Sequence, residues 1–284
     1  MMKTFAVTGA NGYLGSALCQ FLKQRNCKVI SLQRSYNYKD LEEKHVFFSL
    51  KDFQNPEVFN KAESLVHCAY DPIPVSWKAI SEINVQGSIR LFQAAQAGGI
   101  KQIIYISSIS AFDNCDSLYG KAKLAIEKEV ARLGGIIIRP GLIFGGQLGG
   151  FLASLKSIAT HLPLIPLIGR GNQTLYFSHI EDLCGLIYKL SSTPNAITRL
   201  PITAVSQKGK TFKEILITLA YQENKTPLFI PVPWKIIWMS LKILEGARIR
   251  IGFRSDSVIS LVHQNPHLDF NVLKEINYSF RNFN

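Results

Sequence analysis

The chain has 284 residues, of which 47% are hydrophobic and 18% are charged, and its formal net charge at pH 7 is +12. This length and composition predict a globular protein with a large core, in one domain or in one domain with a smaller second region. The positive charge suits an anionic small-molecule ligand or a generally basic surface. The chain has no long Lys/Arg run and no nucleic-acid motif, which argues against nucleic acid as a partner.

The cysteines and the N-terminal residues indicate the cellular compartment and whether the protein binds a metal. The five cysteines are scattered and show no metal-ligand spacing, so we predict a reducing compartment and no metal. Met1-Met2-Lys3 leads directly into an apolar segment that Gly9 interrupts, which is unlike a signal peptide. No apolar run reaches the roughly 20 residues that span a bilayer. We therefore predict a cytoplasmic protein without a transmembrane segment.

A glycine-rich turn lies close to the N-terminus, at residues 8–15 (TGANGYLG). The apolar residues 4–7 before it predict a buried strand, and leucines at helical spacing after it predict a helix. In such a unit Gly9 permits a sharp turn, Gly12 a close approach to a pyrophosphate, and Gly15 close packing of the helix on the strand. The helix N-terminus attracts phosphate. The pattern predicts dinucleotide binding; the alternative is a tight turn without a ligand.

The residues after the next two strands bear on the choice of cofactor. Residues 28–32 predict a second strand, and no acidic residue follows it to accept hydrogen bonds from the ribose hydroxyls of NAD. Arg34 stands there instead, and a guanidinium can pair with the 2′-phosphate of NADP. We therefore favour NADP, with NAD as the alternative if Arg34 is only solvated. Asp52, after a third strand at 45–48, is either an adenine contact or part of a surface turn.

Strands and helices continue to alternate along the next part of the chain. Residues 64–69 predict a strand that ends in the small Cys68 and Ala69, which leave room for a cofactor. A helix over 84–97 and a strand over 102–106 follow. This alternation predicts an α/β fold, a Rossmann-type doubly wound parallel sheet whose ligand binds at the carboxyl ends of the strands.

A tyrosine and a lysine four residues apart open the next predicted helix. Tyr119 and Lys123 share one helix face, and Ser107 and Ser108 lie at the end of the preceding strand. A free tyrosine has a pKa of about 10, and a nearby cation lowers it, so the phenol can exchange a proton with a substrate hydroxyl or carbonyl. A Tyr/Lys pair at this spacing is more often a solvated helix face; the serines and the glycine turn favour catalysis here.

The regular alternation fades after a sixth strand at 135–141. Glycines at 145–150 predict a flexible loop, and residues 161–166 predict irregular structure. We predict an NAD(P)-binding domain over 1–145, with the 175–200 segment completing it, and a mixed substrate-binding lid mainly over 146–284.

The apolar and aromatic segment 229–244 has two interpretations. Such a helix could lie on a membrane surface. We favour a core or lid helix, because its apolar residues are spread round the helix rather than gathered on one face.

Taken together, these motifs resemble the extended short-chain dehydrogenases/reductases, the NAD(P)-dependent epimerase/dehydratase group. The resemblance implies that Tyr119 is the acid/base, that Lys123 lowers its pKa and holds the nicotinamide ribose, and that Ser108 orients the reacting oxygen. Asn84 would prop the active-site helix. The implied cofactor contacts are Gly9, Asn11, Gly12, Tyr13, Leu14, Gly15, Arg34, Asp52, Cys68 and Ala69, together with Tyr119 and Lys123.

The resemblance also implies a substrate contact and an assembly. In sugar-nucleotide members an arginine near the C-terminus meets the nucleotide phosphates; Arg254 has a similar setting, with Arg248 and Arg250 as rivals. The family often dimerises through the helices that correspond to 84–97 and 119–132, so we expect a homodimer.

The departures from the family pattern limit the activity. Ile109-Ser110 replaces the Asp-Glu pair of the family's dehydratases, which argues against a 4,6-dehydratase. The segment from Ser110 to Tyr119 is short, and Pro140-Gly141-Leu142 stands where many epimerases have an asparagine. We expect hydride transfer on a small, anionic substrate and favour a nucleotide sugar. The alternatives are reduction of an apolar, steroid- or flavonoid-like ketone and a non-catalytic nucleotide sensor.

Overall fold

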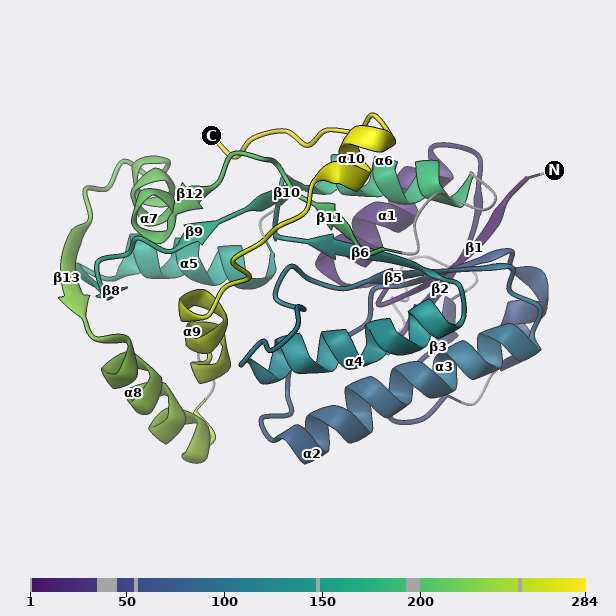
Figure 1. Ribbon diagram of the computed structural model, residues 1–284, viewed down its shortest axis with the longest axis horizontal. Coiled ribbons are helices and arrows are strands. Elements are labelled where there is room, and N and C mark those ends of the chain that lie inside the picture. The colour runs from purple at the N-terminus through teal and green to yellow at the C-terminus, as the bar shows by residue number, and fades with distance from the viewer. Residues whose placement is uncertain (1, 35–44, 54–55, 147–148, 193–199, 250–251) are drawn as a thin grey trace.

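The computed structural model describes residues 2–34, 45–53, 56–146, 149–192, 200–249 and 252–284. A parallel sheet of seven strands forms its larger part (Figure 1). The strand order is β11-β6-β5-β4-β1-β2-β3, and every neighbouring pair in this sheet is parallel. The strands are β1 (Thr4–Thr8), β2 (Lys28–Gln33), β3 (His45–Phe47), β4 (Ser64–His67), β5 (Gln102–Ile106), β6 (Ile136–Pro140) and β11 (Ile202–Ala204).

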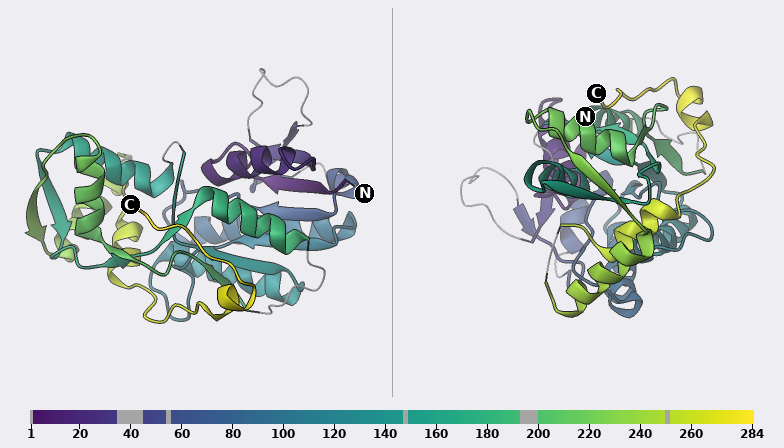
Figure 2. Two further views of the ribbon diagram at one scale, coloured as in Figure 1. Left: turned by 90° about the horizontal axis from the view of Figure 1, so that it is seen from above. Right: turned by 90° about the vertical axis from the view of Figure 1, so that its left-hand side faces the viewer.

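Helices cover both faces of this sheet, as Figures 1 and 2 show. On one face lie α1 (Tyr13–Lys23), α6 (Ile180–Ser191) and the short α10 (Asn271–Glu275). On the other lie α3 (Gln86–Ala97) and α4 (Leu118–Arg132). A 3₁₀ turn (Pro56–Lys61), the short α2 (Trp77–Ile80) and a π-helical turn (Ser81–Val85) complete this part.

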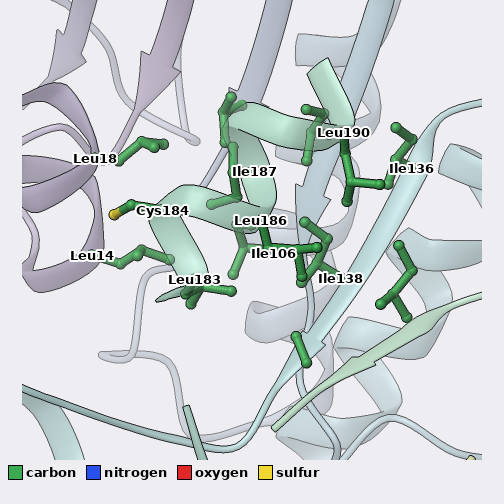
Figure 3. Close-up of a cluster of buried hydrophobic side chains, with 14 of the residues drawn as sticks. Leu14, Leu18, Ile106, Ile136, Ile138, Leu183, Cys184, Leu186, Ile187 and Leu190 are labelled. Carbon is green, nitrogen blue, oxygen red and sulfur yellow. The ribbon is translucent and has the colours of Figure 1, made fainter. Parts of the chain in front are cut away.

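Alternating side chains of the strands supply both layers of the core. In β5, Ile104 and Ile106 face α1 and α6, whereas Ile103 and Tyr105 face α3 and α4. Figure 3 shows the first layer, in which leucines of α1 and α6 meet isoleucines of β5 and β6. Strands that are buried on both faces read as continuous apolar runs, which is why the sequence revealed them. The predicted α/β, doubly wound fold is confirmed.

The order of the strands places the ligand site. The chain builds β1, β2 and β3 outward in one direction and β4, β5, β6 and β11 in the other, so the order reverses between β1 and β4. Ligands of open parallel sheets bind at such a switch point, outside the carboxyl ends of the strands. Both the glycine turn after β1 and Cys68 after β4 lie there.

A smaller region covers this edge of the sheet and has its own core (Figures 1 and 2). It contains three two-stranded pairings, β10–β7, β12–β9 and β13–β8. Its elements are β7 (Leu142–Phe144), α5 (Gly150–His161), β8 (Leu164–Ile168), β9 (Thr174–Leu175), β10 (Phe177–His179), β12 (Lys210–Thr211), α7 (Phe212–Tyr221), β13 (Leu228–Val232), α8 (Trp234–Gly246) and α9 (Ser255–Val262). We call this region the lid. The division of the chain into domains stays a prediction.

Two expectations for the lid were wrong. The stretch 161–166 is not irregular throughout, because Leu164–Ile168 form β8, which pairs in parallel with β13. Ile165 and Leu167 are buried while Leu164 and Pro166 are exposed, so the strand has the usual period of two. Its prolines obscured that period, and they are tolerated because β8 is an edge strand, with β13 as its single partner within the described part of the chain. In the loop at 145–150, Gly150 already belongs to α5.

The segment 229–244 divides at Pro233 into β13 and α8. Trp234, Trp238 and Leu241 of α8 pack against the lid core. Ile236, Met239 and Ile243 share the opposite side and are 52%, 55% and 68% exposed. The apolar residues therefore do occupy two distinct sides, one packed and one facing solvent. Among the described residues, no helix has the length and apolar character needed to cross a membrane.

Candidate active site

The glycine turn after β1 is closed by its own backbone. Gly9 has φ +65°, and its carbonyl accepts a hydrogen bond from the N–H of Gly12 at 2.8 Å. A Cβ on Gly15 would lie 2.1 Å from the oxygen of Gly9, and one on Gly9 would lie 3.1 Å from the backbone of Ala69. A side chain is excluded at Gly15 and is strained at Gly9, where the positive φ and the close approach of Ala69 both favour glycine.

A groove of about 140 Å³ runs beside this turn. Its lining includes Gly9, Asn11, Gly12, Arg34, Cys68 and Ala69, all predicted to contact the cofactor, and Lys51, which the sequence argument did not select. A glycine cradle that a Cβ would fill, at a helix N-terminus and with Arg34 and Lys51 in the lining, fits a phosphorylated dinucleotide. Burial raises the pKa of the Cys68 thiol, so this side chain is a neutral wall.

Three other predicted cofactor contacts lie elsewhere. Asp52 is exposed and is not part of the lining described for this groove, so its contact with adenine stays a prediction. The side chain of Leu14 is buried in the core, which leaves only its backbone available to a ligand. Tyr13 lines a larger pocket instead, and its hydroxyl donates to the carbonyl of Gly145 at 2.6 Å.

That larger pocket, of about 770 Å³, lies between the sheet edge and the lid. Ser108 and Tyr119 line it from the sheet side, and Arg254 lines it from the lid. Tyr70 lines both this pocket and the cofactor groove, so the two cavities adjoin at this residue. A substrate bound against Tyr119 would therefore lie next to a cofactor bound along the glycine turn.

Ser107 and Ser108 have different surroundings. Ser107 is buried, and its hydroxyl donates to Oε1 of Glu127. Glu127 also receives both Nε and Nη2 of Arg139, at 2.8 Å and 2.6 Å. Ser108 faces the pocket, where its Oγ accepts the N–H of Ser110 at 3.1 Å. The Glu127–Arg139 ion pair thus holds Ser107 in place just after β5. Ser108 is the serine that faces the pocket.

Tyr119 and Lys123 lie on the inner side of α4. Burial raises the pKa of Tyr119 to about 12, and a hydrogen bond with Ser108 acts in the opposite direction. This differs from our expectation that Lys123 holds that pKa low. The Lys123 ammonium lies 5.7 Å from the ring centroid of Tyr119 and donates to the carbonyl of Ile106 at 2.8 Å. Burial lowers the pKa of Lys123 itself to about 8.

Asn84 is fully buried within the π-helical turn and supports the loop after β4. Its Oδ1 accepts the N–H of Asp71 at 2.7 Å, and its Nδ2 donates to the carbonyl of Asp71 at 3.0 Å. Tyr70, one residue earlier, meets Tyr119 edge to face at 5.0 Å. Asn84 therefore acts on the site through this loop. Tyr70 was missed because one aromatic residue after a strand carries no recognisable pattern.

The guanidinium of Arg254 already has hydrogen-bond partners within the protein. Its guanidinium donates to the carbonyls of Pro72 and Pro74, the latter at 3.0 Å. Its Nε lies 3.9 Å from a carboxylate oxygen of Glu245. Of its rivals, Arg248 is exposed and Arg250 lies outside the described residues. Arg254 is thus the one arginine in the described lining of the large pocket, and it already fastens the lid to the loop after β4.

Comparisons with known proteins show the family of this chain. A family model described as "NAD dependent epimerase/dehydratase family" matches residues 5–201. A UDP-glucose 4-epimerase from Vibrio cholerae is 25% identical over 271 residues, which cover 84% of this chain and 80% of the relative. A 2-alkyl-3-oxoalkanoate reductase from Stenotrophomonas maltophilia is 26% identical over 204 residues, which cover 62% of this chain and 61% of that one.

Solved structures share the fold. The structure of MoeE5 in complex with UDP-glucuronic acid and NAD superimposes with a TM-score of 0.76 over 99% of this chain and 94% of that chain, at 18% identity. At 18% identity, this similarity shows a shared fold.

Proposed function

This chain belongs to the NAD dependent epimerase/dehydratase family, and on that premise we propose that it transfers a hydride between a nicotinamide dinucleotide and a carbonyl or alcohol carbon, with Tyr119 as acid/base. One observation carries the proposal: the pocket that contains Tyr119 and Ser108 adjoins the glycine-lined groove at Tyr70. The cofactor supplies or receives the hydride when it is bound. The protein side chains donate or accept the proton that accompanies the hydride.

Each residue then has a distinct task. In the reducing direction, the Tyr119 hydroxyl gives its proton to the substrate oxygen as the carbonyl carbon receives the hydride. Ser108 donates a hydrogen bond to the same oxygen and holds it toward Tyr119. The Lys123 ammonium, 5.7 Å from the ring, stabilises the phenolate that remains. In the oxidising direction the phenolate removes the proton from the alcohol.

We propose NADP as the preferred cofactor, and NAD as the alternative. The family model is NAD dependent and MoeE5 is described with NAD, so the preference rests on this chain's own residues. Arg34 and Lys51 both line the groove, and two cations there suit a 2′-phosphate.

Two substrate classes remain, each favoured by a different observation. The epimerase relative and the MoeE5 complex favour a nucleotide sugar, which is the class we expected from the sequence. The lining favours an apolar ketone, since Ile109, Leu142 and Leu261 line the pocket and Arg254 is held by backbone carbonyls. The 2-alkyl-3-oxoalkanoate reductase relative supports this second class. If the cofactor is recycled within one turnover the result is epimerisation, and if it is released the result is reduction or oxidation.

A single panel separates these possibilities. Purified protein is incubated with NADPH or NADH and a 2-alkyl-3-oxoalkanoate, and with NADP+ or NAD+ and UDP-glucose or UDP-glucuronic acid, for wild type and Tyr119→Phe. Cofactor consumption that the variant loses supports a reductase, and sugar isomerisation without net consumption supports an epimerase. Tight cofactor binding with no turnover on any substrate would favour the sensor. The same preparation tests the proposed homodimer through α3 and α4, since light scattering should give twice the chain mass of 31.8 kDa.

A further inference from the structure

The first turn of α4 is held by a side chain from the lid. Oδ1 of Asp256 accepts the backbone N–H of Leu118 at 2.8 Å, and its Oδ2 accepts that of Tyr119 at 2.9 Å. The helix's own N-cap, Ser117, reaches only the N–H of Gly120, at 3.1 Å. Two amides that α4 cannot satisfy internally are therefore satisfied by a residue 137 and 138 positions further along the chain.

The chemistry of this contact makes it strong. A carboxylate at a helix N-terminus meets the positive end of the helix dipole, and hydrogen bonds to an ionised acceptor are about twice as strong as neutral ones. Because the two amides belong to consecutive residues, the bidentate contact fixes the direction of the chain there as well as its distance. One of those residues is Tyr119, so the backbone from which the phenol projects is itself held.

Asp256 is in turn held by its neighbours. The N–H and hydroxyl of Ser255 donate to the two carboxylate oxygens of Glu245 in α8, at 2.9 Å and 2.8 Å. Arg254 donates to the carbonyls of Pro72 and Pro74. Each of three consecutive residues thus makes a different contact: Arg254 binds the loop after β4, Ser255 binds α8 within the lid, and Asp256 binds α4. The contacts of Arg254 and Ser255 hold the backbone that carries Asp256 beside the first turn of α4.

We propose that Asp256 is a positioning residue for Tyr119, through which the lid sets the place of the active-site tyrosine. The inference rests on the proposed function only for its effect on turnover, because the contact itself can be tested without a substrate. It also explains why the lid and the sheet share one site: a lid that loosens at residues 254–256 releases both the first turn of α4 and the loop that carries Tyr70.

The test compares Asp256→Ala and Asp256→Asn with the wild type and with a matched control. The control is Asp116→Asn, because Asp116 pairs with His263 at 2.7 Å and so also joins the lid to the segment before α4, but at the surface and without touching the α4 amides. Hydrogen exchange is measured at the amides of Leu118 and Tyr119. We expect exchange to accelerate at least about tenfold in Asp256→Ala, less in Asp256→Asn, and not in Asp116→Asn.

Two further readouts separate positioning from general stability. The ultraviolet titration of Tyr119, taken as the difference from Tyr119→Phe, should move to lower pH in Asp256→Ala, since loosening the first turn of α4 admits water to a phenol whose pKa is raised by burial. The NADPH-dependent reduction of 9,10-phenanthrenequinone should lose at least about tenfold in kcat, with KM and NADPH affinity within about twofold of wild type, and Asp256→Asn should recover part of it.

The outcomes can be told apart. Unchanged exchange at both amides, or equal acceleration in Asp116→Asn, would overturn the contact as a positioning device. Faster exchange with an unmoved Tyr119 titration would overturn the link to the tyrosine. If the wild type does not reduce the quinone, the proposed function loses support, while exchange and titration still decide the role of Asp256.

Discussion

Nδ1 of His67 lies 2.7 Å from Oγ1 of Thr8, the last residue of β1 and the first of the glycine turn. The direction of this bond follows from its neighbours. The Ser88 hydroxyl donates to the carbonyl of Asn84 at 2.6 Å, so its oxygen must accept Nε2–H of His67, at 2.8 Å. Nδ1 is then an acceptor, and Thr8 donates to it while accepting the N–H groups of Cys68 and Ala69. A neutral imidazole thus connects the cofactor turn to Asn84.

We predict a pH-dependent stability from this chain of hydrogen bonds. Burial, and then the charge of Lys123, lower the pKa of His67 from 6.5 to about 3. The unfolded chain therefore binds a proton that the folded chain does not between these values, so stability is full above pH 6.5 and falls as the pH drops below it. The expected loss is about 1.4 kcal/mol per pH unit. Urea unfolding of wild type and His67→Gln from pH 7.5 to 4.5 measures it. Parallel curves for the two proteins would contradict the assignment.

A second prediction concerns Tyr119 and pH. Because burial raises its pKa to about 12, the phenol keeps its proton at neutral pH. Reduction, which needs the acid form, should be flat between pH 6 and 8, whereas oxidation, which needs the phenolate, should rise about tenfold per pH unit. Above about pH 8 the loss of the Lys123 proton should flatten that rise. Initial rates in both directions measure this.

The matched variants are Tyr119→Phe and Tyr70→Phe. Removing the Tyr119 hydroxyl should lower kcat by about 10²–10⁴ without weakening cofactor binding, whereas removing that of Tyr70 leaves the ring contact intact and should cost far less. Comparable losses in both variants would argue against Tyr119 as the acid/base.

Much of the site could be predicted because its signals are local. Gly9, Gly12 and Gly15 lie within one turn, and Tyr119 and Lys123 lie within one helical repeat, so spacing alone states their geometry. The sheet could be predicted for a similar reason, since each buried strand is a short apolar run between helices.

The missed features all depend on contacts far along the chain. Asp256 reaches Tyr119 across 137 residues, and nothing in the sequence around either residue records that contact. Likewise β8 is recognisable only from its pairing with β13. Burial, which raises the pKa of Tyr119 and lowers that of Lys123, depends on elements beyond the helix that carries both residues, so their spacing alone does not reveal these shifts.

A third prediction concerns the two sides of α8. We expect Trp238→Ala to lower the free energy of unfolding by about 2 kcal/mol, since Trp238 packs on the lid core, and Met239→Ser to change it by less than about 0.5 kcal/mol. Urea unfolding measures both. As a lid helix, α8 should leave the protein in the supernatant with vesicles of equal phosphatidylcholine and phosphatidylglycerol. Sedimentation that Met239→Ser and Ile243→Ser abolish would instead support contact with a membrane surface.

The last prediction is the choice of cofactor. Arg34 and Lys51 line the groove beside the glycine turn, and no acidic residue follows β2 directly to bind the ribose hydroxyls of NAD. A guanidinium–phosphate hydrogen bond contributes about 1.5–3 kcal/mol, so Arg34→Ala should weaken NADPH binding about 10- to 100-fold and leave NADH binding unchanged. Lys51→Ala should weaken NADPH binding less, because an ammonium makes no bidentate pair.

Calorimetric titration measures each, with Arg132→Ala as the control, since that exposed arginine pairs with Glu129 in the last turn of α4. Equal loss of both cofactors would mean that Arg34 only shapes the groove. NADH binding that is tight and indifferent to Arg34 would favour an epimerase that retains NAD.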